Sequence, residues 1–189
     1  GGKVALGGSS LGAIIGYCSA VRYKNIDALI CYSLWDLQDP AFQTSQLKTG
    51  KYTRPLIPLF KFLSKIFGDV MLPTTMFVDY SAFSDKEDLN NCILKDPQTS
   101  KRTSIRAMVS LITESKADIP FEKCPFPTFV IQPENDKTIP RPFVLQAYKR
   151  LGCMKRYVEI PRADHFSSYP GNNEFCADQI ATWLEEVLK

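Results

Sequence analysis

The sequence lacks the signatures by which common cofactor and metal sites are recognised. It contains neither a GxGxxG fingerprint nor a Gly-Lys-Ser/Thr phosphate loop, so nothing in it predicts a dinucleotide or nucleoside triphosphate site. Its six cysteines lie far apart without a CxxC pair, and only one histidine is available to join them as a metal ligand. We therefore expect neither a metal nor an organic cofactor.

Strong charge and long apolar runs are also missing. The formal net charge is +3 and no block of basic residues stands out, which argues against a nucleic-acid partner. No signal peptide, transit peptide or apolar run of membrane-spanning length is visible. The spacing of the cysteines indicates free, mostly buried thiols, so we expect a reducing compartment and a cytoplasmic location. Because their number is even, the alternative of a secreted protein with disulfide bonds stays open.

What the chain does have is an alternation of apolar runs and helical patterns. Its 189 residues are 44% hydrophobic, which suits an ordinary globular domain. Near-continuous apolar runs of strand length are typical of parallel strands buried on both faces, and amphipathic patterns of helix length separate and follow them. The runs are 26–35, 128–131 and 156–160, and the helical patterns are 141–151 and 174–188. This order predicts an α/β fold with a parallel sheet.

A long insertion interrupts this alternation. Residues 36–121 are too many for a loop, so they predict a helical subdomain between core segments 1–35 and 122–189. Helices are expected over 58–68 and 104–115, whereas the polar stretch 81–100 is expected on the surface. In the first helix, one face would carry four apolar residues, Leu59, Phe62, Leu63 and Ile66. This face either packs within the subdomain or gates an apolar substrate.

A GxSxG sequence, Gly8-Ser9-Ser10-Leu11-Gly12, follows a short apolar run and opens an apolar helical segment that should end near residues 22–25. A serine on such a strand-to-helix turn has its hydroxyl lifted clear of the backbone, and the helix N-terminus favours a developing oxyanion. Gly8 and Gly12 would leave room for the strained turn and for close packing of helix on strand. Ser10 is therefore the candidate nucleophile, although a turn of this composition could instead cradle a phosphate.

A serine needs a base, and His165 is the one histidine of the chain. A lone histidine is more often a surface or core residue, but this one follows the last predicted strand, where open α/β folds place ligands. For the carboxylate that orients it, Asp136 follows the strand at 128–131. Glu134 and Asp164 are alternatives, and Asp136 could instead serve as a turn or helix-capping residue.

The order Ser10, Asp136, His165, each just after a predicted strand, resembles the α/β-hydrolase family. The likeness is greatest to serine hydrolases with a helical cap, such as monoacylglycerol lipase-like and lysophospholipase-like esterases. It covers essentially the whole chain but only the C-terminal part of the family's fold, because family members place about four strands before the serine. We expect an N-terminal segment, attached to this chain, cleaved from it or present as another chain, to supply these strands and the second oxyanion donor.

The resemblance implies hydrolysis of a carboxylic ester through an acyl-enzyme, and the apolar character of the insertion predicts a medium or long acyl chain. Ser10, His165 and Asp136 would form the triad, and the Leu11 backbone N–H would bind the oxyanion. Three alternatives stay open: a non-catalytic ligand-binding member of the fold, an acyltransferase, and a thioesterase. The expected partner is a small ester or lipid.

Overall fold

The computed structural model describes residues 2–46, 50–167 and 169–189. The chain divides into two compact units, each described here by itself. Unit 1 comprises Gly1–Asp36 with Ala117–Lys189, and unit 2 comprises Leu37–Lys116. The chain thus returns to unit 1 earlier than the expected boundary at residue 121.

Unit 1 is built on a parallel sheet of four strands in the order β1-β2-β5-β6. The strands are β1 (Ala5–Ser9), β2 (Ala28–Tyr32), β5 (Thr128–Pro133) and β6 (Lys155–Ile160). All six residues of β5 are buried, as expected of a central strand covered on both faces. The predicted α/β fold with a parallel sheet is confirmed. The second strand is shorter than its apolar run because Ser33, with φ of 60°, leaves the extended conformation.

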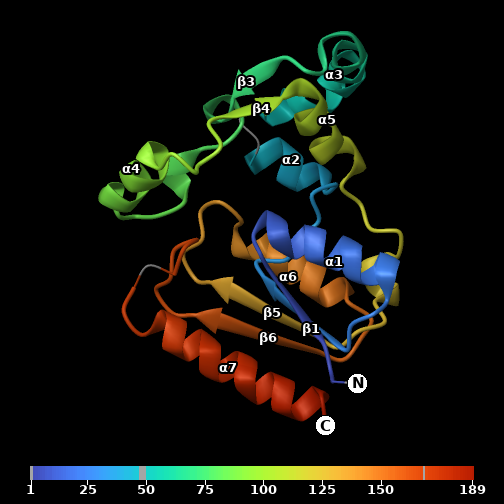
Figure 1. Ribbon diagram of the computed structural model, residues 1–189, viewed down its shortest axis with the longest axis vertical. Helices are drawn as coiled ribbons and strands as arrows, with labels where there is room; N and C mark the ends of the chain where they lie inside the picture. Colours follow the sequence, from blue (N-terminus) through green and yellow to red (C-terminus); the bar gives the residue numbers. More distant parts are fainter. Residues whose placement is uncertain (1, 47–49, 168) are drawn as a thin grey trace. The chain divides into compact units, whose positions relative to one another are not determined.

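Helices cover both faces of this sheet. Figure 1 shows α1 (Leu11–Tyr23) and α6 (Arg141–Arg150) along one face and α7 (Asn172–Val187) along the other. The expected end of the first helix is confirmed, since Lys24 adopts a left-handed conformation and donates its N–H to Ala20 O. On the α7 side, Phe129 packs on Trp183 with ring centroids 5.8 Å apart. A buried core of apolar side chains thus joins β5 and β6 to the last helix.

The first strand lies tightly under α1 at one glycine. A Cβ on Gly8 would stand 2.2 Å from Gly12 O, so only glycine allows this approach of strand to helix. At Gly12 itself, a Cβ would meet no described atom within 4 Å outside its own helix and chain neighbours. The expectation of a packing role is therefore confirmed for Gly8 and wrong for Gly12.

Unit 2 contains four α-helices and a pair of short antiparallel strands among the residues that the structure describes. They are α2 (Pro40–Gln46), α3 (Thr53–Phe67), α4 (Glu87–Lys95), α5 (Ile105–Glu114), β3 (Met71–Pro73) and β4 (Arg102–Ser104). The helices expected over 58–68 and 104–115 are present as α3 and α5. The helix α4 and the two strands were not predicted, because α4 is largely polar and strands of three residues show no periodicity.

Of the two alternatives for the apolar face of α3, packing within unit 2 holds for only one of its four residues, and gating of an apolar substrate stays a prediction. Leu63 faces inward together with Ile57 and Phe60, which line a cavity beside α5. The other three members of that face are exposed, with fractions of 49% for Leu59, 59% for Phe62 and 58% for Ile66. Apolar residues occupy so much of the circumference of α3 that periodicity alone does not select the packed side.

Candidate active site

Ser10 occupies the turn between β1 and α1 with φ of 54° and ψ of −128°, a strained backbone for a residue other than glycine. Two hydrogen bonds hold the turn: Ser10 N donates to Tyr32 O at 2.9 Å, and Ala13 N donates to Ser10 O at 2.8 Å. The first ties the serine to the neighbouring strand β2, and the second begins the helix. The result is a side chain presented at the carboxyl end of the sheet.

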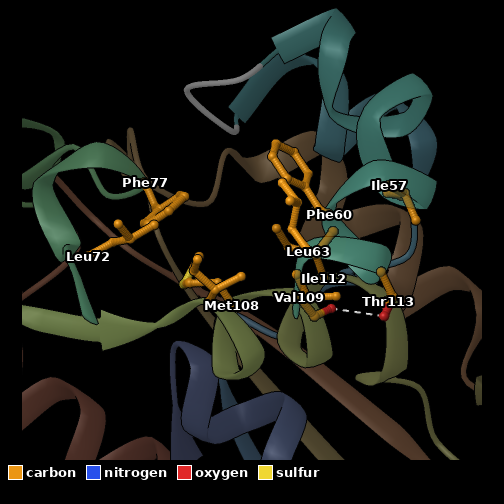
Figure 2. A pocket seen from close by; sticks show the side chains of 10 residues that line it. Ile57, Phe60, Leu63, Leu72, Phe77, Met108, Val109, Ile112 and Thr113 are labelled. Carbon is orange, nitrogen blue, oxygen red and sulfur yellow. Dashed lines mark hydrogen bonds between the residues drawn. The ribbon is translucent and has the colours of Figure 1, made fainter. Parts of the chain in front are cut away.

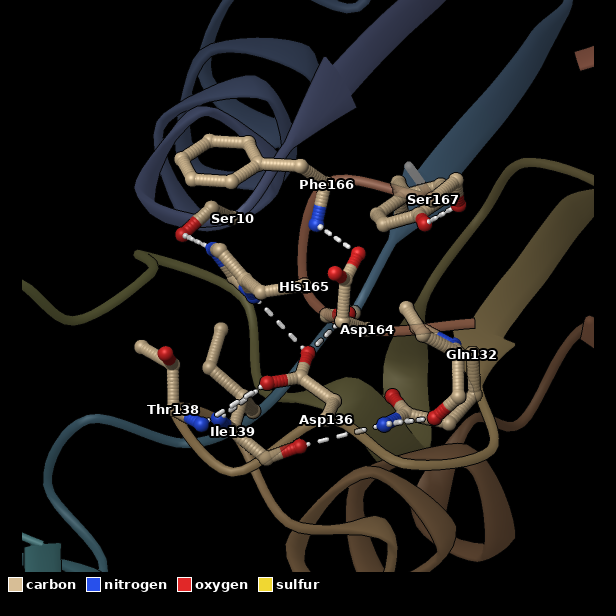
Figure 3. A network of polar contacts seen from close by, with 12 residues as sticks. Ser10, Gln132, Asp136, Thr138, Ile139, Asp164, His165, Phe166 and Ser167 are labelled. Carbon is tan, nitrogen blue, oxygen red and sulfur yellow. Dashed lines mark hydrogen bonds and ion pairs between the residues drawn. The ribbon is translucent and has the colours of Figure 1, made fainter. Parts of the chain in front are cut away.

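His165 connects the two other candidate residues. Its Nε2 lies 3.0 Å from Ser10 Oγ, and its Nδ1 lies 2.8 Å from Asp136 Oδ2 (Figure 3). The imidazole is almost completely buried, since its side chain is 5% exposed. Three residues from distant parts of the sequence therefore form one hydrogen-bonded chain, in which each follows a strand of the parallel sheet.

The carboxylate of Asp136 has a partner on every side. Oδ1 accepts hydrogen bonds from Thr138 N at 2.9 Å and Ile139 N at 2.8 Å, while Oδ2 faces the imidazole. The side chain is completely buried. An acceptor fixed at Nδ1 favours the tautomer that carries its proton there, which leaves the Nε2 lone pair directed at the Ser10 hydroxyl. This arrangement suits proton transfer from serine to histidine.

The other two carboxylates considered from the sequence bind backbone groups. Glu134 Oε2 accepts from Arg162 N at 2.7 Å, and Asp164 Oδ1 accepts from Phe166 N at 3.2 Å. Both interactions shape the loop that carries His165. Their geometry suits a supporting role in that loop.

Two residues that the sequence did not point to hold the loop between β5 and α6 that carries Asp136, here called the acid loop. Ser33 is fully buried just after β2, and its hydroxyl donates to Asp136 Oδ2 at 3.2 Å. Gln132 is fully buried in β5, and its Nε2 donates to Pro133 O at 3.0 Å and Ile139 O at 3.1 Å. The available signals were a serine at the carboxyl end of a strand and one amide in an otherwise apolar strand.

The acid and histidine loops are also joined through their backbones. Glu134 N donates to Ile160 O at 3.1 Å, and Asn135 N donates to Ala163 O at 2.8 Å. These bonds extend the contact of β5 with β6 beyond the ends of the strands. They keep the two loops in register, so that the carboxylate and the imidazole meet.

Leu11 is the first residue of α1. The first N–H groups of a helix have no acceptor within the helix, and the helix dipole makes them favourable to anions. Its role as oxyanion donor stays a prediction. Beside the imidazole of His165, a hollow of about 410 Å³ lies between the sheet and α7, lined in part by Tyr32, His165 and Ile180.

The described residues contain no group of three or more His, Cys, Asp or Glu side chains placed to hold a metal ion. Within the same residues, no helix combines the length and the apolar character needed to cross a membrane.

Comparison with known proteins reveals similarity only at the level of structure. No family model and no curated protein matches the sequence. A monoacylglycerol lipase from Paleococcus ferrophilus is similar with a TM-score of 0.68 and 20% identity, over 97% of this chain and 68% of that one. A soluble variant of the Saccharomyces cerevisiae monoglyceride lipase, in complex with a substrate analogue, has a TM-score of 0.70 and 16% identity over 99% and 63%.

The esterase domain of a Rhodothermus marinus protein is also similar, with a TM-score of 0.56 and 14% identity over 98% of this chain and 61% of that one. The TM-scores establish the fold, whereas sequence identities this low leave the chemistry open. The expected resemblance is confirmed at that level, since the neighbours include lipases and esterases. The chain therefore has the α/β-hydrolase fold, and it spans between 61% and 68% of the length of these three solved structures.

Proposed function

We propose that the protein is a serine hydrolase that cleaves carboxylic esters through an acyl-enzyme. The observation that carries the proposal is the hydrogen-bonded chain from Ser10 through His165 to Asp136. Serine hydroxyls are weak nucleophiles at neutral pH, and a base held by a buried carboxylate is the usual means of activating them. The likeness to solved lipases and esterases supports the same reaction class.

In this mechanism, Ser10 Oγ attacks the ester carbonyl while its proton passes to His165 Nε2. Asp136 remains ionised and stabilises the imidazolium. The Leu11 N–H donates to the oxyanion of the tetrahedral intermediate. The imidazolium then protonates the leaving alcohol, and an acyl-enzyme is left on Ser10. A water molecule, deprotonated by the same histidine, releases the carboxylic acid and restores the serine.

An apolar cavity within unit 2 supports a lipid-like ester with a medium or long acyl chain as substrate. The cavity has a volume of about 200 Å³ and lies between α3, α5 and the segment around β3 (Figure 2). Side chains that line it include Phe60, Leu63, Leu72, Phe77, Met108 and Val109. A cavity without polar partners does not hold water well and favours hydrocarbon.

A fluorophosphonate probe tests the proposal, because it reacts with activated serines. We expect one label, mapped to Ser10 by peptide analysis and lost in Ser10→Ala. The matched control is Ser9→Ala, which removes the exposed neighbouring hydroxyl and should keep the label. A folded protein that takes no label would favour a non-catalytic, ligand-binding member of the fold.

Product analysis with and without an added alcohol or thiol acceptor distinguishes hydrolysis from acyl transfer. We expect the free carboxylic acid as the main product in both cases. An ester or thioester of the acceptor as the main product would identify an acyltransferase instead.

A further inference from the structure

Two cysteines lie at the end of unit 1 that is opposite the candidate active site. Cys124 precedes β5 and Cys153 precedes β6, whereas Ser10, Asp136 and His165 follow the carboxyl ends of parallel strands. The proposed ester hydrolysis uses neither thiol. Each is a free cysteine in the structure, with Cys124 buried and Cys153 half-buried.

One hydroxyl brings the two sulfur atoms together. Cys124 Sγ lies 3.5 Å and Cys153 Sγ lies 3.6 Å from Thr128 Oγ1. The two sulfur atoms therefore lie around one oxygen atom, and a disulfide between them also requires that their backbones are close.

The backbones around the two cysteines are pressed together. Gly152 N donates to Phe121 O at 3.0 Å. A Cβ on Gly152 would stand only 1.9 Å from Glu122 O. Because residue 152 is glycine, the segment before Cys153 can lie directly against the segment before Cys124. The chain segments that precede the two cysteines therefore lie in contact, which favours a disulfide between them.

The local chemistry distinguishes the two sulfurs. A hydrogen bond from the Cys153 thiol lowers the pKa of Cys124, against the opposing effect of burial. The same hydrogen bond and burial raise the pKa of Cys153. By contrast, burial raises the pKa of the Cys31 and Cys176 thiols. A thiolate is the reactive form of cysteine, so Cys124 is the expected nucleophile of the pair.

We propose that Cys124 and Cys153 form a modification site, at which hydrogen peroxide oxidises the two thiols to a disulfide. The Cys124 thiolate attacks one peroxide oxygen: an S–O bond forms, the O–O bond breaks, and the hydroxide released takes up a proton to become water. Cys153, as it loses its proton, attacks the Cys124 sulfur. The S–S bond forms, the S–O bond breaks and a second water leaves. Two thiols lose two electrons, and one peroxide becomes two waters.

The disulfide would fasten the segment that returns from unit 2 to the sheet of unit 1. This segment also rests on α1, since Tyr17 donates its hydroxyl to Ile119 O at 3.1 Å and its ring lies 4.8 Å from that of Phe121. A cross-link at Cys124 therefore restrains a junction of three elements. It should raise the Tm of the oxidised protein by roughly 5–10 °C.

Peroxide treatment followed by peptide mapping tests this site. The folded chain is treated with hydrogen peroxide, unfolded, alkylated with iodoacetamide and digested. We expect two of the six thiols to be lost, one peptide pair to be linked between Cys124 and Cys153, and dithiothreitol to reverse both changes. Cys153→Ala should abolish the link, whereas Cys92→Ser, which removes the exposed cysteine, should leave it intact.

Other oxidation patterns overturn the proposal. These are a disulfide between other cysteines, oxidation of Cys124 to a sulfinic acid without a link, or retention of all six thiols under conditions that oxidise glutathione. Because wild-type protein alone gives these results, the test does not depend on whether a variant folds. It is also independent of the ester hydrolysis, which is measured separately through labelling of Ser10.

Discussion

The two units use burial in different ways. At the candidate active site of unit 1, the polar side chains of Asp136, His165 and Ser33 are buried and hydrogen-bonded to one another. In unit 2, apolar side chains surround a cavity, and none of the residues of α5 is fully buried. Buried hydrogen bonds hold polar atoms to within a fraction of an ångström, whereas a loosely filled apolar shell accommodates ligands of different shape. The first property suits bond chemistry and the second suits the binding of hydrocarbon.

The largest expected effect comes from removing the base in unit 1. His165→Ala should lower kcat/KM for a soluble ester by about 10⁴- to 10⁶-fold, because no other histidine can take the proton from Ser10. Hydrolysis of p-nitrophenyl acetate measures this, and circular dichroism checks that the variant folds. If turnover is unchanged in a folded variant, the base lies elsewhere and the precise polar network of unit 1 serves another purpose.

Asp136→Asn should lower kcat by about 10³- to 10⁴-fold while KM changes little. The amide no longer selects the histidine tautomer that directs a lone pair at Ser10 and no longer stabilises the imidazolium. Steady-state kinetics with the same ester measures the loss. Asp178→Asn, at an exposed position of α7, is the matched control and should behave as wild type. Equal effects of the two substitutions would contradict the role given to Asp136.

A smaller effect is expected from filling the cavity of unit 2. Val109→Phe should lower kcat/KM for p-nitrophenyl decanoate about tenfold, because the new ring displaces roughly two methylene groups of the ligand. Hydrolysis of the acetate should stay within about twofold of wild type. Ile66→Ser, on the exposed side of α3, should change neither rate. Similar losses with both esters would mean that the cavity does not select hydrocarbon.

The smallest effect is expected at Ser33, which acts through Asp136. Ser33→Ala removes one of several hydrogen bonds to the carboxylate, about 1 kcal/mol, and should lower kcat about fivefold at constant KM. Ser33→Gly also lacks the hydroxyl but relieves the positive φ, so it should show the same kinetic loss with higher stability than the alanine variant. Wild-type activity in the glycine variant would assign Ser33 a purely conformational role.

The two units also differ in how much of their structure could be predicted from the sequence. In unit 1, continuous apolar runs and the GxSxG turn predicted strands and helices that the structure confirms, because a doubly buried strand and a tight strand-to-helix turn constrain composition locally. In unit 2, periodicity found α3 but not the side on which it packs. The helix α4 and the paired strands β3 and β4 show no clear pattern in the sequence, since short, partly exposed elements tolerate many residues.

Local constraints explain what the sequence by itself determined: the α/β layout, the close approach at Gly8 and the serine on its turn. Only the tertiary structure decided which distant groups meet. It brought Ser33 and Gln132 to the acid loop, selected the inward side of α3, and placed Cys124 and Cys153 on the same Thr128 hydroxyl. The physical reason is that these contacts depend on strand order and on the paths of loops, which no single segment encodes.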